Sequence, residues 1–164
     1  MQVEVSVQDL SDSPNCPVAV ATWEDWFHCW LETLHAQLPA APIYELSLRL
    51  TDDLEIQTLN CQYRHQNCPT DVLAFAALEV DFPLPDELVG SLPLYLGDIV
   101  ISIDTAQRQA TQHGHPLSSE LAWLAVHGLL HLLGWDHPDE DSLIQMLDQQ
   151  DCLLEKIGLV LERV

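Results

Sequence analysis

Three histidines lie close together in the segment HGLLHLLGWDH, residues 127–137, among Leu, Gly and Trp residues. From Leu121 to Leu133 the only polar side chains are those of His127 and His131. An α-helix that is apolar on all sides is typical of a buried helix, and two buried imidazoles without partners would cost about 1–3 kcal/mol each. Residues four apart share one helix face. These two imidazoles are therefore spaced to bind a single metal ion.

Gly134 and His137 extend this pair to a three-ligand site. Gly134 falls where the helix is expected to end, and glycine takes the left-handed C-cap conformation with least strain, so the chain can turn back and bring His137 to the same ion. The spacing H-x3-H-x5-H leaves a fourth position open, as in a catalytic zinc site. We predict one Zn²⁺ per chain, held by His127, His131 and His137. Two alternatives remain at this stage: histidines paired with backbone groups, or a structural zinc that takes Asp136 or a cysteine as its fourth ligand.

The spacing also resembles the metzincin signature H-E-x-x-H-x-x-G-x-x-H, with one departure. Where those peptidases carry the glutamate that acts as general base, this chain has Gly128. Glycine inside a helix costs about 1 kcal/mol relative to alanine, so Gly128 does not serve helix stability. Because the proton acceptor is missing, a zinc peptidase is the lesser alternative.

At 164 residues the chain is most simply one domain, spanning residues 1–164. Alternating apolar residues predict strands, and apolar residues at helical spacing predict helices. The class expected is one α+β or mixed α/β domain with a small sheet. The last helix is expected to bury Leu143, Met146, Leu147, Leu154 and Ile157, and an acidic segment, 79–93, is expected to be an exposed loop. The expected strands are 3–7, 43–50, 72–78 and 95–103, and the expected helices are 22–38, 52–64, 104–112, 116–133 and 139–156.

The charge of the chain argues against a nucleic-acid partner. Twenty-six Asp and Glu residues stand against five Lys and Arg residues, a net charge of −21. Such a surface repels polyanions at long range.

Five scattered cysteines without a CxxC motif predict reduced thiols rather than a disulfide framework. A second metal site at Cys61, His65 and Cys68 is disfavoured, since no fourth ligand follows at finger-like spacing. The chain shows no apolar run of membrane-spanning length and no signal-peptide pattern at its start. We therefore expect no membrane association, and a location in the cytoplasm or an equivalent organellar stroma or matrix.

Further motifs accompany the histidine segment: LNCQYRHQNCPTDVLAFA (59–76), LGDIVIS (96–102) and ELAWLAVHG (120–128). Together they resemble the YbeY family of bacterial and organellar endoribonucleases, the rRNA maturation factors. The motifs cover about half the chain, in the family's order and at its spacing, while the first fifty residues match only in general layout. The resemblance implies a small mixed four-stranded sheet packed against about five helices, with a metzincin-like three-histidine metal site. It also implies a metal-dependent, single-strand-specific endoribonuclease that matures the 16S rRNA 3′ end and contributes to ribosome quality control.

Carried over by motif, His127, His131 and His137 are similar to the family's zinc ligands, and Arg64 matches the arginine implicated in activity. Zinc lowers the pKa of its bound water to about 7 and acts as a Lewis acid, and an arginine offers a bidentate fork to phosphate oxygens. Attack by that water or by the RNA 2′-OH would fit equally well.

The candidate catalytic residues are therefore Arg64, His131 and Asp136. Asp136 is expected to orient a ligand imidazole or to accept a proton. The alternative for Asp136 is an exposed acidic residue in a loop. The alternative for Arg64 is a surface arginine at a helix end. Asp71 and Asp98, in the other motifs, are interpreted as structural residues or as partners of the ligands.

One departure from the family concerns RNA binding. Basic residues usually follow the YR pair, whereas this chain has His65 and Gln66. We favour a single-stranded rRNA substrate, with no role for DNA, presented on the small ribosomal subunit through docking to an assembly GTPase or a ribosomal protein. The alternative is a zinc-containing ribosome assembly factor without catalysis.

Overall fold

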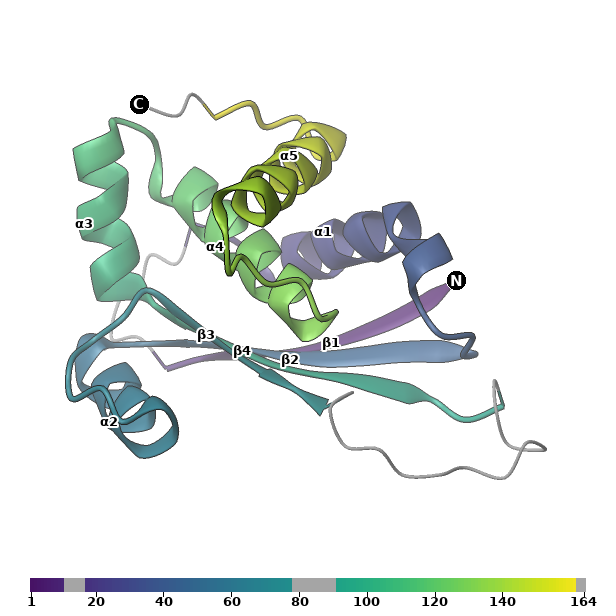
Figure 1. Ribbon diagram of the computed structural model, residues 1–164, viewed down its shortest axis with the longest axis horizontal. Coiled ribbons are helices and arrows are strands. Elements are labelled where there is room, and N and C mark those ends of the chain that lie inside the picture. The colour runs from purple at the N-terminus through teal and green to yellow at the C-terminus, as the bar shows by residue number, and fades with distance from the viewer. Residues whose placement is uncertain (11–16, 78–90, 162–164) are drawn as a thin grey trace.

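A computed structural model describes residues 1–10, 17–77 and 91–161 of the chain and shows one mixed four-stranded sheet with helices on both faces (Figure 1). Helices α1, α4 and α5 cover one face, α3 stands at an end of α4, and α2 lies on the opposite face. The α+β class, the four-stranded mixed sheet and the five helices are therefore confirmed. The elements are β1 (Gln2–Asp9), α1 (Val20–Thr33), a 3₁₀ turn (His35–Gln37), β2 (Ile43–Thr51), α2 (Asp53–Arg64), β3 (Val72–Ala76), β4 (Leu94–Ser102), α3 (Ile103–His113), α4 (Leu117–Leu132) and α5 (Glu140–Lys156).

The sheet has the strand order β1-β2-β4-β3. β1 runs parallel to β2, and β2 runs parallel to β4, whereas β3 is antiparallel to β4. On β2 the side chains alternate between buried and half-buried, as expected when one face of a strand lies against the main core. The antiparallel edge strand β3 carries the segment after Arg64 back along the sheet, beneath α4.

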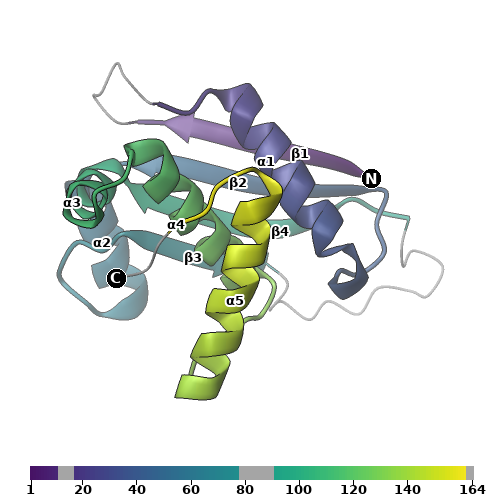
Figure 2. The same cartoon turned by 90° about the horizontal axis from the view of Figure 1, so that it is seen from above.

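Helix α4 lies at the centre of the molecule, between the sheet and α5, and Figure 2 shows it from above, crossing the strands beside α1 and α5. Eleven of its sixteen residues are buried, which confirms that the apolar segment is an internal helix. On the opposite face of the sheet, α2 packs through Ile56 against Leu73 and Val100 in a smaller apolar cluster. The histidine-bearing helix is thus held between the sheet and α5, and the sheet is covered by α2 on its other face.

Local capping interactions set the ends of the helices that matter for the site. Asp52 caps α2 by accepting a hydrogen bond from the Glu55 amide at 2.9 Å, and Asp139 forms a capping box with Ser142 at the start of α5. The first contact fixes the start of α2, which ends at Arg64, and the second fixes where the loop after α4 rejoins a helix.

Three sequence-based expectations need correction or restriction. The helix expected over 22–38 ends at Thr33 and continues as a 3₁₀ turn, because Pro39 forces Leu38 into an extended conformation. Leu143 is 38% exposed and is not part of the core, whereas its neighbours Met146 and Leu154 are buried as expected. The expected acidic loop at 79–93 lies largely outside the described residues. Among the helices that the structure describes, none is long and apolar enough to cross a membrane.

Candidate functional site

The three predicted ligands meet in space. One turn of α4 brings His127 Nε2 to 3.0 Å from His131 Nε2. His137, from the loop after the helix, completes a group whose ligand atoms all lie within 4.8 Å of one another. The ring centroid of His137 lies 6.1 Å from that of His127 and 5.7 Å from that of His131.

The turn that returns His137 to the helix is the one expected from Gly134. Gly134 has a φ of +93°, in the left-handed region, directly after the last helical residues. Its amide donates to the His131 carbonyl at 3.1 Å, and the Trp135 amide donates to the Leu130 carbonyl at 3.0 Å. These two bonds form a Schellman motif, which satisfies the last carbonyls of the helix while reversing the chain.

His127 is oriented by two neighbours, Gln150 and Trp123, that were not among the predicted site residues. Its Nδ1 lies 3.2 Å from Oε1 of Gln150 on α5, and its ring stacks on Trp123 at 5.4 Å between centroids and 7° between planes. When Nδ1–H donates to the Gln150 oxygen, the Nε2 lone pair faces the other imidazoles. The sequence contains one indication of this role. Gln150 lies four residues after Met146, so it is a polar residue on the buried face of α5.

Burial also keeps these imidazoles in the form that binds metal. Burial is the largest influence on the pKa of His127 and lowers it below the ordinary imidazole value, against a weaker opposing effect of the Gln150 hydrogen bond and the Asp71 charge. The pKa of His131 is likewise lowered, first by burial and then by the charges of the neighbouring imidazoles. Neutral imidazole is the ligand form, since a protonated ring has no free lone pair.

The donor set fits a divalent metal ion. Two nitrogens at about 2.05 Å from a tetrahedral ion stand about 3.3 Å apart, close to the 3.0 Å between the two Nε2 atoms. His131 also hydrogen-bonds to the backbone of Trp135, so both rings have a partner elsewhere and turn Nε2 toward each other. Without a proton or a cation between them, two lone pairs at this distance would repel.

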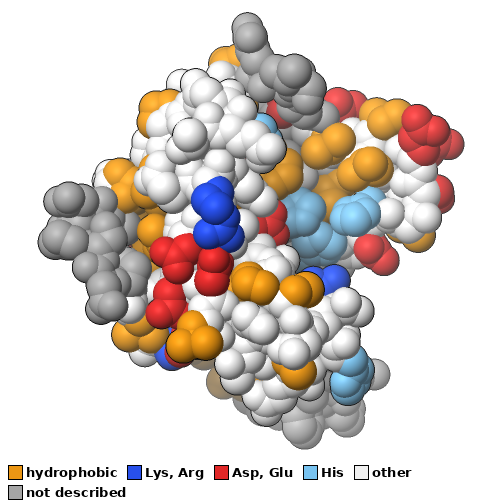
Figure 3. All heavy atoms as spheres, turned by 90° about the vertical axis from the view of Figure 1, so that its left-hand side faces the viewer, with side chains coloured by type: hydrophobic (Ala, Val, Ile, Leu, Met, Phe, Trp, Pro, Cys, Tyr) orange, Lys and Arg blue, Asp and Glu red, His pale blue; other side chains and the backbone are white. Residues whose placement is uncertain are grey.

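The three imidazoles line an open cleft of about 790 Å³ between α4, the end of α2 and β3. Figure 3 shows histidine side chains gathered in a hollow of this face, beside apolar side chains and a Lys or Arg side chain. The cleft lining includes the aromatic residues Tyr63, Phe75 and Trp135 and the charged residues Arg64, Asp71 and Asp136.

Arg64 is placed at this cleft by the end of α2. It makes no hydrogen bond or ion pair within the described residues, whereas Arg49 is paired with Glu55 and Arg108 with Asp53. Arg64 is therefore an available cation on the cleft wall, while those other two guanidiniums are already engaged.

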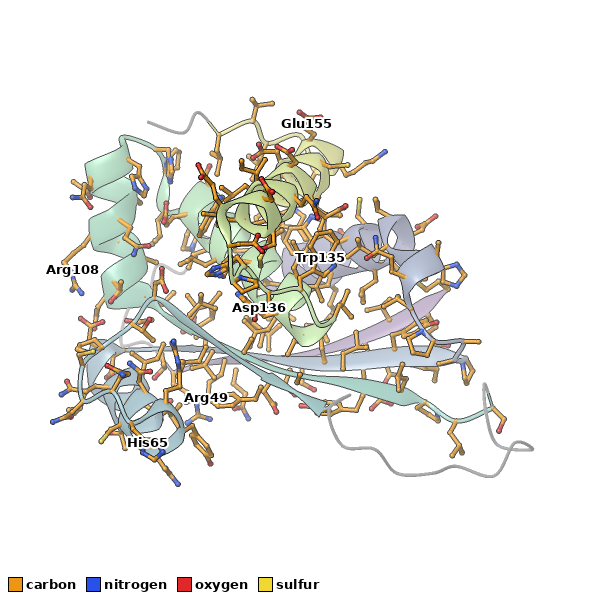
Figure 4. The ribbon with its side chains drawn as sticks, in the orientation of Figure 1. Arg49, His65, Arg108, Trp135, Asp136 and Glu155 are labelled. Carbon is orange, nitrogen blue, oxygen red and sulfur yellow. The ribbon has the colours of Figure 1, made fainter. Side chains whose placement is uncertain are left out.

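Two of the three aspartates considered from the sequence lie in the cleft. Asp136 is exposed on the loop after α4, and its Oδ1 accepts from the His137 amide at 2.8 Å. Figure 4 shows Asp136 and Trp135 on this loop, beneath α5 and above the sheet. Asp71 also lines the cleft, and its Oδ2 accepts from Gln109 Nε2 of α3 at 3.2 Å. Asp98 is not among the cleft residues and instead accepts from the Tyr95 hydroxyl at 2.6 Å.

Gly128 lines the cleft and lies close to the sheet. A Cβ on Gly128 would lie 2.9 Å from Ile99 Cγ2 and 3.3 Å from Val72 Cγ2. The glycine therefore lets α4 approach β3 and β4 closely, and any larger side chain at this position would require Ile99 or the helix to shift.

The remaining cysteine set brings no comparable cluster together. Cys61, His65 and Cys68 do not form a group of converging metal ligands in the described part of the chain, and the four cysteines described are free thiols.

A family model described as "Endoribonuclease YbeY" matches residues 10–158 of the chain. The chain belongs to the YbeY family. A relative named endoribonuclease YbeY from Trichormus variabilis is 63% identical, covering 97% of this chain and 96% of that protein. Endoribonuclease YbeY from Nostoc sp. is 63% identical, covering 97% of this chain and 92% of that protein. Endoribonuclease YbeY from Trichodesmium erythraeum is 61% identical, covering 88% of this chain and 79% of that protein.

A solved structure shares the YbeY-type fold of this chain. The solution structure of TM1509 from Thermotoga maritima superimposes with a TM-score of 0.57 at 23% identity, covering 93% of this chain and 88% of that one. The resemblance to the YbeY family expected from the motifs is thereby confirmed over nearly the whole chain, including the N-terminal residues that matched only in layout.

Proposed function

We propose that this chain is a metal-dependent, single-strand-specific endoribonuclease that acts in rRNA maturation, including the 16S rRNA 3′ end, and in ribosome quality control. The observation that carries the proposal is the convergence of three imidazoles at an open cleft, which is also lined by an arginine that has no ion pair among the described residues. Relatives at up to 63% identity over nearly their whole length are named endoribonuclease YbeY, which supports the same activity here.

In this proposal His127, His131 and His137 hold one Zn²⁺, which would supply Lewis acidity and activate a nucleophile for phosphodiester cleavage. Gln150 and Trp123 keep the His127 ring in the orientation and tautomer needed for binding. Asp136 lies in the loop beside His137 and lines the cleft, so we assign it the role of proton acceptor, and its hydrogen bond to the His137 amide holds that loop in place.

Arg64 is assigned the substrate phosphate. A guanidinium presents several donors in a planar fork that matches two phosphate oxygens. Because Arg64 has no partner within the described residues, binding a phosphate would not require an existing ion pair to be broken. It would also offset the negative charge of the two cleft aspartates.

The aromatic side chains of the cleft account for selectivity toward unpaired RNA. Tyr63 is 58% exposed and packs edge-on against Phe75 at 5.1 Å between centroids, next to Arg64 in sequence. Bases of single-stranded RNA stack on exposed aromatic rings, at about 1–3 kcal/mol per base, whereas paired bases are already stacked. Stacking does not depend on counterion release, so a chain with a net charge of −21 can use it.

The overall charge also supports delivery of the substrate by a protein partner. With five Lys and Arg residues in the whole chain, affinity for naked RNA through phosphate contacts is weak. We therefore propose docking on the small ribosomal subunit, through a ribosomal protein or an assembly GTPase, as the source of most of the binding energy.

The test is RNA cleavage by the zinc-loaded protein on free single-stranded RNA and on immature small subunits. His131→Ala and Arg64→Ala are expected to reduce cleavage at least about a hundredfold, and Arg64→Lys to restore only part of it. Arg108→Ala is the matched control, since Arg108 lies on α3 away from the cleft and is paired with Asp53 (Figure 4). Cleavage that survives both cleft substitutions would refute the proposal, and faster cleavage of free RNA than of subunits would refute the docking step.

A further inference from the structure

A second cluster of metal-ligating side chains lies at the corner between α3 and α4. His113 ends α3, His115 lies in the connecting turn, and Glu120 is in the first turns of α4. Their ligand atoms all lie within 4.8 Å of one another, as in the first site. We call these three residues the corner cluster.

The carboxylate of the corner cluster is buried, and its contacts are imidazoles. The Glu120 side chain is 3% exposed, and its Oε2 contacts both His115 Nε2 and His113 Nδ1, the latter at 3.3 Å. A buried carboxylate needs a positive partner, because removing it from water without one costs several kcal/mol. The cation is either a protonated histidine or a metal ion held by all three side chains.

The corner cluster is assembled by the same backbone device as the first site. Gly114, with a φ of +72°, follows the last residue of α3, and the His115 amide donates to the Ala110 carbonyl at 3.1 Å. This Schellman motif reverses the chain and directs His115 back toward the helix end. The backbone that carries both histidines is therefore fixed by hydrogen bonds.

We propose that His113, His115 and Glu120 form a second divalent metal site, of the zinc type, that ties the end of α3 to α4. Two imidazoles and one carboxylate are a ligand set that zinc uses in proteins. The His113 side chain is 51% exposed, so an ion can enter from solvent and keep a water ligand on that side. Imidazole ligands favour zinc over magnesium, which prefers oxygen ligands only.

The second site is separate from the first. Glu120 and His127 are seven residues apart on α4, which corresponds to about 10 Å along the helix axis. That separation is well beyond the 3.5–4 Å of paired catalytic ions, so the two sites do not share a ligand or a substrate atom. The function that fits is structural: α3 carries Gln109, which donates to Asp71 in the cleft, so fixing α3 also fixes that aspartate.

Zinc binding by the full chain tests the proposal independently of RNA cleavage. The protein is equilibrated with ZnCl₂, dialysed and analysed for metal. Wild type is expected to hold two ions per chain, and His127→Ala/His131→Ala, which removes the first site, is expected to hold one. Adding Glu120→Gln, which preserves the shape of the side chain but removes its charge, is expected to weaken the remaining site at least about tenfold. His35→Ala, at an exposed histidine of the 3₁₀ turn, is the matched control.

Thermal unfolding in the His127→Ala/His131→Ala background provides a second readout. ZnCl₂ is expected to raise the unfolding temperature of this variant, because ligand binding to the folded state stabilises it. MgCl₂ at the same concentration is expected to have no such effect, and the zinc effect should disappear on adding His115→Ala or Glu120→Gln. Absence of bound zinc in the His127→Ala/His131→Ala variant, or a zinc effect unchanged by both corner substitutions, would overturn the proposal and leave a histidine–glutamate ion pair.

Discussion

Gln150→Leu isolates the contribution of the residue that orients His127. Gln150 is completely buried, and its Oε1 is the partner of His127 Nδ1 at 3.2 Å. Losing an outer partner of a metal-binding histidine lowers metal affinity about 10–100-fold, which corresponds to about 1.4–2.8 kcal/mol. We therefore expect the dissociation constant for zinc at the three-histidine site to rise by that factor.

The stability of the metal-free protein should change far less. The substitution removes the hydrogen-bond partner of His127 Nδ1, and leaving this buried ring nitrogen unpaired costs about 1–3 kcal/mol. It also removes Gln150 Nε2, a buried donor that has no hydrogen-bond partner in the described part of the chain and whose burial costs a similar amount. The two effects oppose each other, so the free energy of unfolding without metal is expected to change by less than about 1 kcal/mol.

Zinc affinity is measured by competition with a chromophoric chelator, and stability by urea unfolding of the metal-free protein. The corner substitution Glu120→Gln is included in every variant so that only the three-histidine site is titrated. Gln145→Leu, an exposed position on the same helix, is the matched control. A zinc affinity for Gln150→Leu within twofold of its parent, or a loss explained by an equal loss of stability, would refute the orienting role.

The remaining predictions concern the backbone and the pH dependence. Gly128→Ala is expected to destabilise the fold by about 1–2 kcal/mol in urea unfolding, because overpacking against β4 outweighs the gain of about 1 kcal/mol in helix propensity; a stabilised variant would contradict the close-approach argument. Gly134→Ala forces a side chain into a left-handed conformation, and we expect a loss of about 1 kcal/mol together with weaker zinc binding, measured by the same chelator competition. In the metal-free protein the lowered pKa values of His127 and His131 mean that the folded state binds fewer protons than the unfolded chain below about pH 6.5. Stability, measured as the unfolding temperature, should therefore fall as the pH drops from about 6.5 through the folded pKa values. The fall should be shallower in His127→Ala/His131→Ala. Equal slopes in the two proteins would show that other groups are responsible.

The sequence predicted the elements because hydrophobic periodicity is a local property. The helices and strands lie close to where the apolar spacing placed them, and the errors fall at ends and on surfaces. The helix expected over 22–38 ends early at a proline-dependent turn, and Leu143 is exposed because α5 has core on only one side. The burial of a given leucine depends on which neighbour covers it, and periodicity does not contain that information.

In the candidate site, too, the residues that are close in sequence were predictable and those from other elements were not. His127, His131, Gly134 and His137 lie within one short segment, so helix geometry and one glycine turn were enough to predict that they converge. Arg64 came from the family resemblance, since nothing local connects the end of one helix with a histidine far along the chain. Its catalytic role, like that of Asp136, stays a prediction.

The sequence alone therefore determined the segment in which three histidines converge, the class of fold and the family, because each is encoded in short-range spacing and motif order. Only the tertiary structure decided which residues from other elements complete the site. Gln150 of α5 contacts His127 of α4 because these two helices pack together. Asp71 lines the cleft because β3, which follows it, runs beneath α4. The corner cluster likewise depends on packing, because the start of α4 must meet the end of α3 for Glu120 to lie buried beside two imidazoles. Contacts between distant segments depend on how helices pack on the sheet, and packing is a property of the whole chain rather than of any window within it.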